Sequence, residues 1–295
     1  MRKLVRALTV IIPVCTILAL VGRGLFGTPM GQAVATAALG QCSFDQVRDG
    51  EHFQQQMGKV RTTMWEGSHK LREDGNYQLW STPQGEFWYH GPFGNLDAFV
   101  LAEEQFDIYR TERIRPGSIV LDCGANYGTF TRRALNRGAA KVVAIEINHD
   151  IQEALRRTFA NEIREGKVVV YGKGVWDSET ELDLRGDSVV VERNGPPVRV
   201  PVTTIDQIVS ELQLPSVDFI KMDIEGAEKN ALRGARATLL KFSPVMAISA
   251  EHLPDDAQAI PAQVKELAPG LRMEFGFCEL SKPFHAAPNV IHFSK

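Results

Sequence analysis

The stretch 119–135, IVLDCGANYGTFTRRAL, constrains the fold of this chain more than any other. The apolar run 119–121 is typical of a buried parallel strand. It ends at Asp122 and is followed by a turn that contains Gly124 and Gly128, and then by a run that favours a helix. Glycine lets a backbone turn sharply and approach a ligand, because it has no Cβ. The stretch therefore predicts a strand, a glycine-rich turn and a helix that bind a nucleotide-type ligand.

The spacing of this turn narrows the class of ligand. It reads Gly-x-Asn-x-Gly, with Asn126 between the glycines, and not the Gly-x-Gly-x-x-Gly of dinucleotide-binding proteins. The next apolar run, 141–147, places Glu146 at the end of a second strand. An acid about 20 residues after the glycines suits the two hydroxyls of a ribose. We therefore expect a nucleoside cofactor other than NAD.

Three motifs make the chain resemble the FkbM family of S-adenosylmethionine-dependent methyltransferases. They are DCGANYGTFT at 122–131, AIEIN at 144–148 and DFIKMDIEGAE at 218–228, and the resemblance covers roughly 74–293. The chain departs from the family at Cys123, where a small aliphatic residue is usual, and at Ile147, where proline is common. Neither departure removes a polar ligand contact. The resemblance implies S-adenosyl-L-methionine as cofactor and a class I, Rossmann-like methyltransferase fold. Its sheet is mostly parallel with an antiparallel closing strand, and helices lie on both faces.

The resemblance also suggests roles for the cofactor residues. The turn with Gly124, Asn126 and Gly128 approaches the cofactor, and Glu146 takes the ribose hydroxyls. Asp122 orders the turn and holds the amino end of the methionine moiety. Trp176 follows the third strand, where the adenine is expected. It either packs on the base or makes an ordinary hydrophobic contact.

The rest of the chain alternates strands with helices, which predicts a parallel sheet covered on both faces. We expect strands at 119–121, 141–147, 167–171, 217–222 and 244–250, with closing strands at 273–278 and 290–293. Helices are expected at 44–72, 96–109, 150–162, 206–212, 227–240 and 255–267, and hairpins at 76–91 and 181–202. Aromatic residues in the first hairpin either cover a substrate or pack on the sheet.

Ligands of an open parallel sheet collect beyond the carboxyl ends of its strands. That rule gathers six residues on one rim: Asp122, Glu146, Asp223, Glu225, Glu251 and His252. A hydroxyl acceptor needs a general base, and histidine has a suitable pKa. We therefore predict His252 as the catalytic base, with Asp223 as a second base or an orienting acceptor and Glu251 beside them. The alternative is a histidine that only bonds its loop.

Two other roles for these acids stay open. Asp223, Glu225 and Glu251 supply the oxygen ligands that Mg²⁺ prefers, but the sequence does not show that they converge, so no metal ligand is assigned. Lys221 lies inside an apolar strand, where an unpaired charge would be costly. We expect it to pair with one of the acids.

Composition limits the partners. The chain has 295 residues, enough for one large α/β domain or two small ones, and a net charge of −3, which gives no support for a nucleic-acid partner. Its four cysteines lie far apart and form no Cys-x-x-Cys pair, so neither a zinc site nor a disulfide framework is expected. Cys123 is interpreted as a small space-filling residue.

The first 27 residues combine Arg2, Lys3 and Arg6 with an uncharged run at 7–22. We interpret 1–27 as a membrane anchor, with a cleaved signal segment or a peripheral leader as alternatives. A linker and helix at 28–73 and a methyltransferase domain at 74–295 follow. The protein is thus expected at a membrane through one N-terminal helix, on a face that the sequence does not decide.

The function predicted from these features is O-methylation of a hydroxyl on a sugar, glycan, lipid-linked or small-metabolite acceptor. An NAD(P)-dependent oxidoreductase is one alternative, and the glycine spacing argues against it. A non-catalytic, membrane-tethered domain that binds the cofactor is the other. The sequence does not predict an oligomeric state.

Overall fold

The structure is a computed structural model that describes residues 42–185, 196–282 and 285–295. These residues form two compact units. The larger unit consists of Met57–Glu274 and Ile291–Lys295. The described residues of the smaller unit come from Cys42–Gln56 and Phe275–Val290. It therefore brings together segments from the two ends of the sequence.

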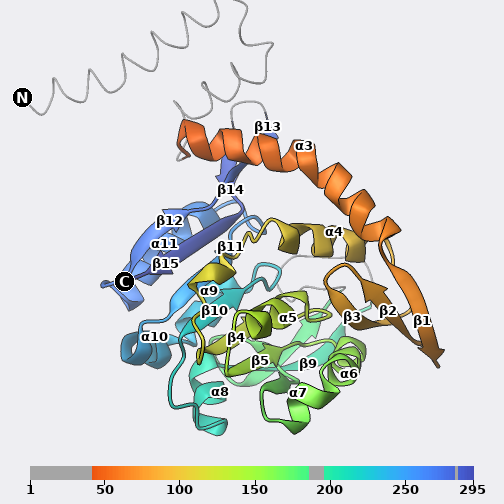
Figure 1. The fold of residues 1–295 in the computed structure, drawn as a ribbon. Coiled ribbons are helices and arrows are strands. Elements are labelled where there is room, and N and C mark those ends of the chain that lie inside the picture. Colours follow the sequence, from red (N-terminus) through yellow and green to blue (C-terminus); the bar gives the residue numbers. More distant parts are fainter. Residues whose placement is uncertain (1–41, 186–195, 283–284) are drawn as a thin grey trace, which may run out of the picture. The chain divides into compact units, whose positions relative to one another are not determined.

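A seven-stranded sheet forms the centre of the larger unit (Figure 1). Its order is β12-β15-β11-β10-β4-β5-β6. The strands are β4 (Ile119–Cys123), β5 (Lys141–Ile145), β6 (Val168–Tyr171), β10 (Phe219–Met222), β11 (Val245–Ser249), β12 (Arg272–Phe275) and β15 (Val290–Ser294). Neighbouring strands in the part β11-β10-β4-β5-β6 of this sheet are parallel. The order reverses between β4 and β10, and such a switch point is where ligands bind in open α/β sheets.

The predicted α/β class is confirmed. All residues of β4 are buried, as expected for a strand covered on both faces. The helices that alternate with the strands are α5 (Thr129–Asn136), α6 (His149–Thr158), α7 (Ala160–Arg164), α8 (Ile205–Glu211), α9 (Glu228–Arg233), α10 (Arg236–Phe242) and α11 (Asp256–Leu267).

The predicted helix 227–240 is two helices, α9 and α10, with a break at Gly234. A Cβ on Gly234 would lie 2.1 Å from the backbone oxygen of Trp176, so the chain passes against another segment there. Asp206 then caps the start of α10, because its carboxylate accepts hydrogen bonds from the backbone N–H groups of Ala237 (2.9 Å) and Thr238 (2.8 Å). The close approach and the cap explain why the helix restarts.

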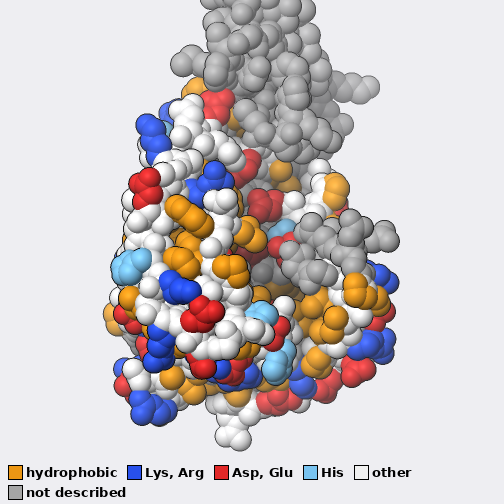
Figure 2. All heavy atoms as spheres, turned by 90° about the vertical axis from the view of Figure 1, so that its right-hand side faces the viewer, with side chains coloured by type: hydrophobic (Ala, Val, Ile, Leu, Met, Phe, Trp, Pro, Cys, Tyr) orange, Lys and Arg blue, Asp and Glu red, His pale blue; other side chains and the backbone are white. Residues whose placement is uncertain are grey.

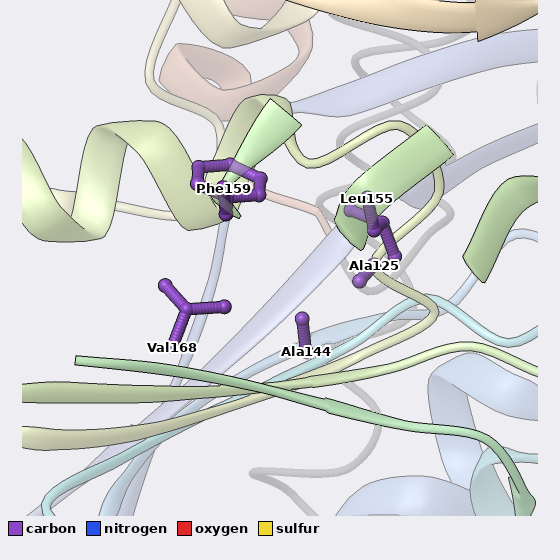
Figure 3. Packing of buried hydrophobic residues seen from close by; sticks show 5 residues of the cluster. All are labelled: Ala125, Ala144, Leu155, Phe159 and Val168. Atoms are coloured by element: carbon purple, nitrogen blue, oxygen red, sulfur yellow. The ribbon is translucent and has the colours of Figure 1, made fainter. Parts of the chain in front are cut away.

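One core cluster packs the end of helix α6 against the glycine-rich turn and the sheet (Figure 3). Leu155 and Phe159 pack with Ala125 of the turn and with Ala144 and Val168 of the sheet. A Phe159→Ala substitution in such a core typically costs about 3–5 kcal/mol. The turn is therefore held by tight packing before any ligand binds.

A second sheet, β1-β2-β3, contains the predicted hairpin. Its strands are β1 (His69–Asp74), β2 (Tyr77–Thr82) and β3 (Gly85–His90). The helix predicted over 44–72 ends earlier, because α3 spans Phe44–Glu66 and the chain then enters β1. Phe87, Trp88 and Tyr89 are buried. These hairpin aromatics therefore pack in the interior, and Tyr89 also lines the cavity described below.

Two further elements complete the larger unit. Helix α4 (Asn95–Gln105) begins where Asp97 accepts a hydrogen bond from the backbone N–H of Gly94, at 2.7 Å. A small sheet contains β7 (Gly174–Val175), β8 (Thr180–Leu184) and β9 (Val198–Thr203), and β8 pairs with β9 antiparallel. The predicted second hairpin is therefore present, and its tip, 186–195, lies outside the described residues.

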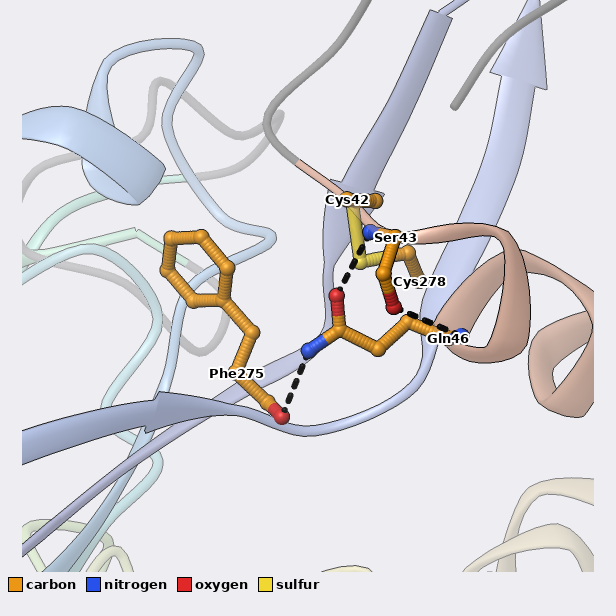
Figure 4. The surroundings of a disulfide bond; sticks show 5 residues. All are labelled: Cys42, Ser43, Gln46, Phe275 and Cys278. Carbon is orange, nitrogen blue, oxygen red and sulfur yellow. Dashed lines mark hydrogen bonds between the residues drawn. A yellow bond between two sulfur atoms is a disulfide. The ribbon is translucent and has the colours of Figure 1, made fainter. Parts of the chain in front are cut away.

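A disulfide between Cys42 and Cys278 lies in the smaller unit (Figure 4). The expectation that the cysteines form no disulfide is therefore wrong. The two residues are 236 positions apart in the sequence, so no local spacing could indicate the pair. They are buried with Val47, and a Cβ on Gly50 would lie 2.1 Å from the backbone oxygen of Cys278. The start of α3 thus packs directly on β13 (Cys278–Lys282).

Polar contacts cap α3 in the same place. Ser43 donates its backbone N–H to Gln46 Oε1 at 2.8 Å, and the Ser43 hydroxyl oxygen accepts from the backbone N–H of Gln46 at 3.3 Å. This reciprocal pair is a capping box. Gln46 also donates from Nε2 to the backbone oxygen of Phe275 at 3.1 Å. Strand β14 (His285–Pro288), which pairs with β13, completes this unit.

The prediction that one N-terminal helix holds the protein at a membrane is contradicted by the helices of the structure. Over 42–185, 196–282 and 285–295, no helix has both the length and the apolar character needed to cross a bilayer. The segment interpreted as an anchor, 1–27, lies outside these residues.

Candidate active site

A cavity of about 570 Å³ lies in the larger unit, within the range of small-molecule sites. The residues that line it follow β4, β5, β10 and β11, as the strand-end rule predicts, and helix α4 supplies another wall. The predicted site residues that line the cavity are Gly124, Asn126, Glu146, Asp223, Glu225, Glu251 and His252.

Glu146 is held by the turn that it faces. Its Oε2 accepts a hydrogen bond from the backbone N–H of Asn126 at 3.0 Å, and its Oε1 accepts from that of Asn148 at 2.9 Å. Burial raises the pKa of the carboxyl group, while these backbone hydrogen bonds oppose the rise. The side chain therefore has a fixed orientation beside the cavity, where it can accept further hydrogen bonds.

The turn itself requires its unusual residues. Gly124 has φ 78°, and a Cβ there would lie 1.9 Å from the backbone oxygen of Asp223. Asn126 also has positive φ, at 46°, a conformation in which asparagine is enriched among non-glycine residues. The ends of β4 and β10 are thus in direct contact, and both border the cavity.

Asp122 does not line the cavity. The residue is fully buried, and its Oδ2 accepts a hydrogen bond from the Thr131 hydroxyl at 2.6 Å. Its Oδ1 lies 3.5 Å from Lys221 Nζ. The predicted ordering of the turn fits this position. The predicted contact with the amino end of a methionine moiety stays a prediction.

Two other predicted cofactor residues are also absent from the cavity wall. A Cβ on Gly128 would lie 2.3 Å from the ring of Phe159, so this glycine serves helix packing. Trp176 takes part in the backbone pairing beside β9, through a hydrogen bond to the oxygen of Thr203 at 2.7 Å. Its predicted place beside an adenine stays a prediction.

Asp223 links the cavity to a buried tyrosine. Tyr109 donates its hydroxyl to Asp223 Oδ2 at 2.8 Å, and Asp223 Oδ1 lies 3.4 Å from His252 Nε2. Burial acts to raise the pKa of Asp223, but Lys221, His252 and the hydrogen bonds outweigh it and hold the pKa below its usual value. Asp223 is therefore a carboxylate at neutral pH.

His252 is held from both sides of its ring. Nδ1 donates to Glu228 Oε1 at 2.9 Å, and Nε2 lies 3.8 Å from Glu225 Oε2 in addition to its contact with Asp223. Glu228 is fully buried and also accepts from the backbone N–H of Ile224 at 2.9 Å. This arrangement fixes Nδ1 as a donor and turns Nε2 toward the cavity.

The charge of His252 follows from these contacts. Burial acts against the charged imidazolium, but the hydrogen bond to Glu228 and the charges of Asp223 and Glu225 outweigh it and raise the pKa to about 9. At neutral pH the ring is therefore mainly protonated. A base at this position works in the fraction of molecules that have lost the proton, and that fraction grows as the pH approaches 9.

Part of the cavity wall is apolar. Leu96, Phe99 and Val100 of α4 line the cavity, and Leu96 is 73% exposed. Glu103 of the same helix and Glu251 also line it. Figure 2 shows a hollow with acidic side chains inside it and hydrophobic side chains beside it. The cavity therefore offers both apolar surface and hydrogen-bond acceptors.

The sequence left open a metal site formed by the acids on the rim. Within the part of the chain that the structure describes, no group of three or more His, Cys, Asp or Glu residues is arranged to hold a metal ion.

The sequence did not point to several residues that shape this site. Glu228 lies in the quoted DIEGAE motif, and its spacing from Asp223 could have suggested a role. Tyr109 and the α4 wall carry no local signal, because they reach the cavity only through the fold. The prediction that Lys221 pairs with an acid is confirmed by its distances to Asp122 (3.5 Å) and Asp223 (3.8 Å).

Residues 122–279 match the model of the methyltransferase FkbM domain. The match spans more than half of the chain and includes the glycine-rich turn, Glu146 and His252. The chain belongs to the FkbM methyltransferase family. The predicted family is therefore confirmed.

Solved structures give a more distant comparison for this FkbM-family protein. An FkbM methyltransferase from Methylobacillus flagellatus KT is 18% identical, with 84% of this chain and 60% of that chain covered and a TM-score of 0.46. The present chain therefore spans three fifths of that protein. Precorrin-6y C5,15-methyltransferase from Geobacter metallireducens GS-15 is 12% identical, with 65% and 86% covered and a TM-score of 0.40. Trm5b from Pyrococcus abyssi is 16% identical, with 77% and 62% covered and a TM-score of 0.41. No curated protein matches the chain.

Proposed function

We propose that the protein is an S-adenosylmethionine-dependent O-methyltransferase that acts on a hydroxyl of a sugar, glycan, lipid-linked or small-metabolite acceptor. The observation that carries this proposal is the His252–Glu228 pair, which directs Nε2 into the cavity that Glu146 also borders. A nucleoside subsite and a positioned histidine in one cavity suit methyl transfer to a group that must lose a proton.

The residues beside the turn fit the proposed cofactor. Glu146 has two carboxylate oxygens held by backbone N–H groups, and ribose hydroxyls are donors that such a carboxylate binds. Gly124 lines the cavity and lets the turn pack closely against the backbone of Asp223. When bound, S-adenosylmethionine supplies an electrophilic methyl group on a sulfonium. Positioning of the acceptor against that group then supplies several kcal/mol of the barrier.

The acceptor would lie against α4. Leu96, Phe99 and Val100 offer an apolar surface, and Glu103 and Glu251 offer hydrogen-bond acceptors for hydroxyl groups. This combination suits a molecule with an apolar part and several hydroxyls. It is the feature that favours a glycoside or another lipid-linked alcohol within the proposed class.

The chain's own part in the chemistry is to take one proton. His252 Nε2 accepts the proton of the acceptor hydroxyl, and Glu228 keeps Nδ1 as the donor and stabilises the imidazolium that forms. Asp223 orients the same nitrogen from a distance of 3.4 Å. Because the pKa of His252 is about 9, turnover should rise with pH up to about that value.

Asp223 is the second candidate for the base, because it lines the cavity and is ionised at neutral pH. In that mechanism the protonated His252 would be a fixed cation beside it. The two mechanisms differ in their pH dependence. With Asp223 as base, turnover would already be constant at neutral pH and would fall as His252 loses its proton near pH 9.

The test is transfer of a labelled methyl group from S-adenosylmethionine to extracted sugars, lipids and small metabolites, followed by mass spectrometry of the product. His252→Ala should lower turnover by about 10²–10⁴-fold. His149→Ala is the matched control, because His149 is 87% exposed and does not line the cavity. Binding of the cofactor without any labelled product would favour a non-catalytic binding protein, and label on nitrogen would contradict O-methylation.

A further inference from the structure

Lys221 of β10 is a buried lysine that the proposed chemistry does not use. The residue is 4% exposed and does not line the cavity. Its Nζ donates a hydrogen bond to the backbone oxygen of Gly124 at 2.7 Å. It also lies 3.5 Å from Asp122 Oδ1 and 3.8 Å from Asp223 Oδ2. A buried ammonium is costly unless its partners are well placed, so this position is closely defined.

The register of the sheet explains the contacts. Strands β10 and β4 are parallel, with Lys221 opposite Asp122. Residues opposite each other in adjacent strands point to the same face, so the ammonium and the carboxylate meet. The longer lysine side chain extends past the end of β4 and reaches the Gly124 carbonyl. The Lys221 side chain thus contacts Gly124 of the glycine-rich turn and also Asp223, which lies beside the predicted base His252.

The surroundings leave this ammonium little freedom. The ring of Tyr109 lies 5.4 Å from Nζ, and the same tyrosine donates to Asp223 Oδ2. Gly124 packs against the backbone of Asp223, where no Cβ could be placed. A shift of Lys221 would therefore disturb both the turn at Gly124 and the carboxylate of Asp223.

We propose that Lys221 is a positioning residue that holds the glycine-rich turn at Gly124 and the Asp223–His252 pair in a fixed arrangement. This inference rests on the proposed function, since it concerns the same cavity. Lys221 touches neither cofactor nor acceptor. It acts through the Gly124 carbonyl on one side and through the Asp223 carboxylate on the other.

The competing explanation is that Lys221 only neutralises the buried charge of Asp122. The two explanations differ for the double substitution Lys221→Met/Asp122→Asn. This change removes the buried charge pair as a whole, and the amide oxygen of the new side chain would still accept a hydrogen bond from Thr131. Simple neutralisation predicts that the double variant regains both stability and cofactor binding. Positioning predicts that it regains stability alone, because the contacts with Gly124 and Asp223 are still missing.

The experiment measures melting temperature and the affinity for S-adenosylhomocysteine by calorimetry on the full chain, and it needs no acceptor. Lys221→Met and the double variant should both bind about tenfold or more weakly, as expected for loss of a charge-assisted hydrogen bond. Only Lys221→Met should also lose much of its thermal stability. Lys229→Met is the matched control, because Lys229 pairs with Asp256 at 3.1 Å but does not line the cavity. It should lower the melting temperature and leave affinity unchanged.

A folded double variant that binds like the wild type would overturn the positioning role, and Lys221 would then serve only to neutralise Asp122. A double variant that does not fold would overturn it too, by making Lys221 a residue required for folding. Failure of the wild-type protein to bind S-adenosylhomocysteine is a different outcome and contradicts the proposed function itself.

Discussion

Substitution of Glu146 by glutamine tests the cofactor subsite most cleanly. The carboxylate accepts hydrogen bonds from the backbone N–H groups of Asn126 and Asn148 at 3.0 and 2.9 Å. Glutamine has the same shape but only one acceptor oxygen, so one of these two bonds is lost. A hydrogen bond to a charged group contributes about 1.5–3 kcal/mol, so the free energy of unfolding should fall by about that amount.

The effect on binding is separate from the effect on stability. A ribose hydroxyl that bonds the carboxylate would lose about 1–3 kcal/mol of binding free energy, which corresponds to an increase of about 5–150-fold in the dissociation constant. Calorimetric titration with S-adenosylmethionine measures this constant, and denaturant unfolding measures stability. Glu153→Gln is a suitable control, because Glu153 pairs with Arg157 at 2.8 Å and does not line the cavity.

A folded Glu146→Gln variant that binds the cofactor as tightly as the wild-type protein would contradict the assignment of Glu146 to the ribose. In that case the carboxylate would serve only to order the turn, and the ribose would lie elsewhere in the cavity. A loss of affinity in Glu153→Gln of similar size would also contradict the assignment, since it would show that the assay responds to general destabilisation.

Three further predictions concern His252, the disulfide and Gly124. Because the pKa of His252 is raised from 6.5 to about 9 in the folded protein, its ion pairs stabilise the fold fully below pH 6.5 and this contribution is lost as the pH rises through 9. The unfolding free energy of wild type should therefore fall by about 2–3 kcal/mol more than that of His252→Gln over this interval, and parallel curves would contradict the pairing. Cys42→Ser should lower stability by about 2–4 kcal/mol, and mass spectrometry of non-reduced digests should find Cys42 linked to Cys278; free thiols at both positions in the untreated protein would exclude the bond. Gly124→Ala should weaken cofactor binding and lower the free energy of unfolding by more than about 1 kcal/mol, because the position has positive φ and an alanine Cβ would clash with the backbone of Asp223. A variant with unchanged binding and stability would show that the ends of β4 and β10 are not in contact.

The sequence correctly predicted those strands whose positions follow from short runs of apolar residues. The apolar runs 119–121 and 141–147 became β4 and β5, because a strand buried on both faces needs uninterrupted apolar residues. Glu146 was placed correctly at the cavity for the same reason, since its position relative to the end of β5 follows from the strand alone.

Asp122 shows where local pattern stops being sufficient. Its place at the end of β4 is as predicted, but the direction of its side chain depends on Lys221 in the neighbouring strand and on Thr131 in α5. These contacts arise from the register between β4 and β10, which the sequence does not state. The same reason explains why Tyr109 was missed, since it reaches Asp223 from 114 residues away.

The disulfide was missed on different grounds. Cys42 and Cys278 come together because the start of α3 packs on β13, a contact between opposite ends of the chain. The absence of a Cys-x-x-Cys pair excludes only one kind of cysteine site. Counting cysteines by their spacing therefore cannot exclude a single long-range bond.

The most direct test of the account is a crystal structure of the protein with S-adenosylhomocysteine. We expect the ribose hydroxyls within hydrogen-bond distance of the Glu146 carboxylate, and the sulfur on the side of the cavity that Asp223 and His252 border. A nucleoside bound away from Glu146, or a sulfur directed away from His252, would contradict the proposed site and the role of His252 as the base.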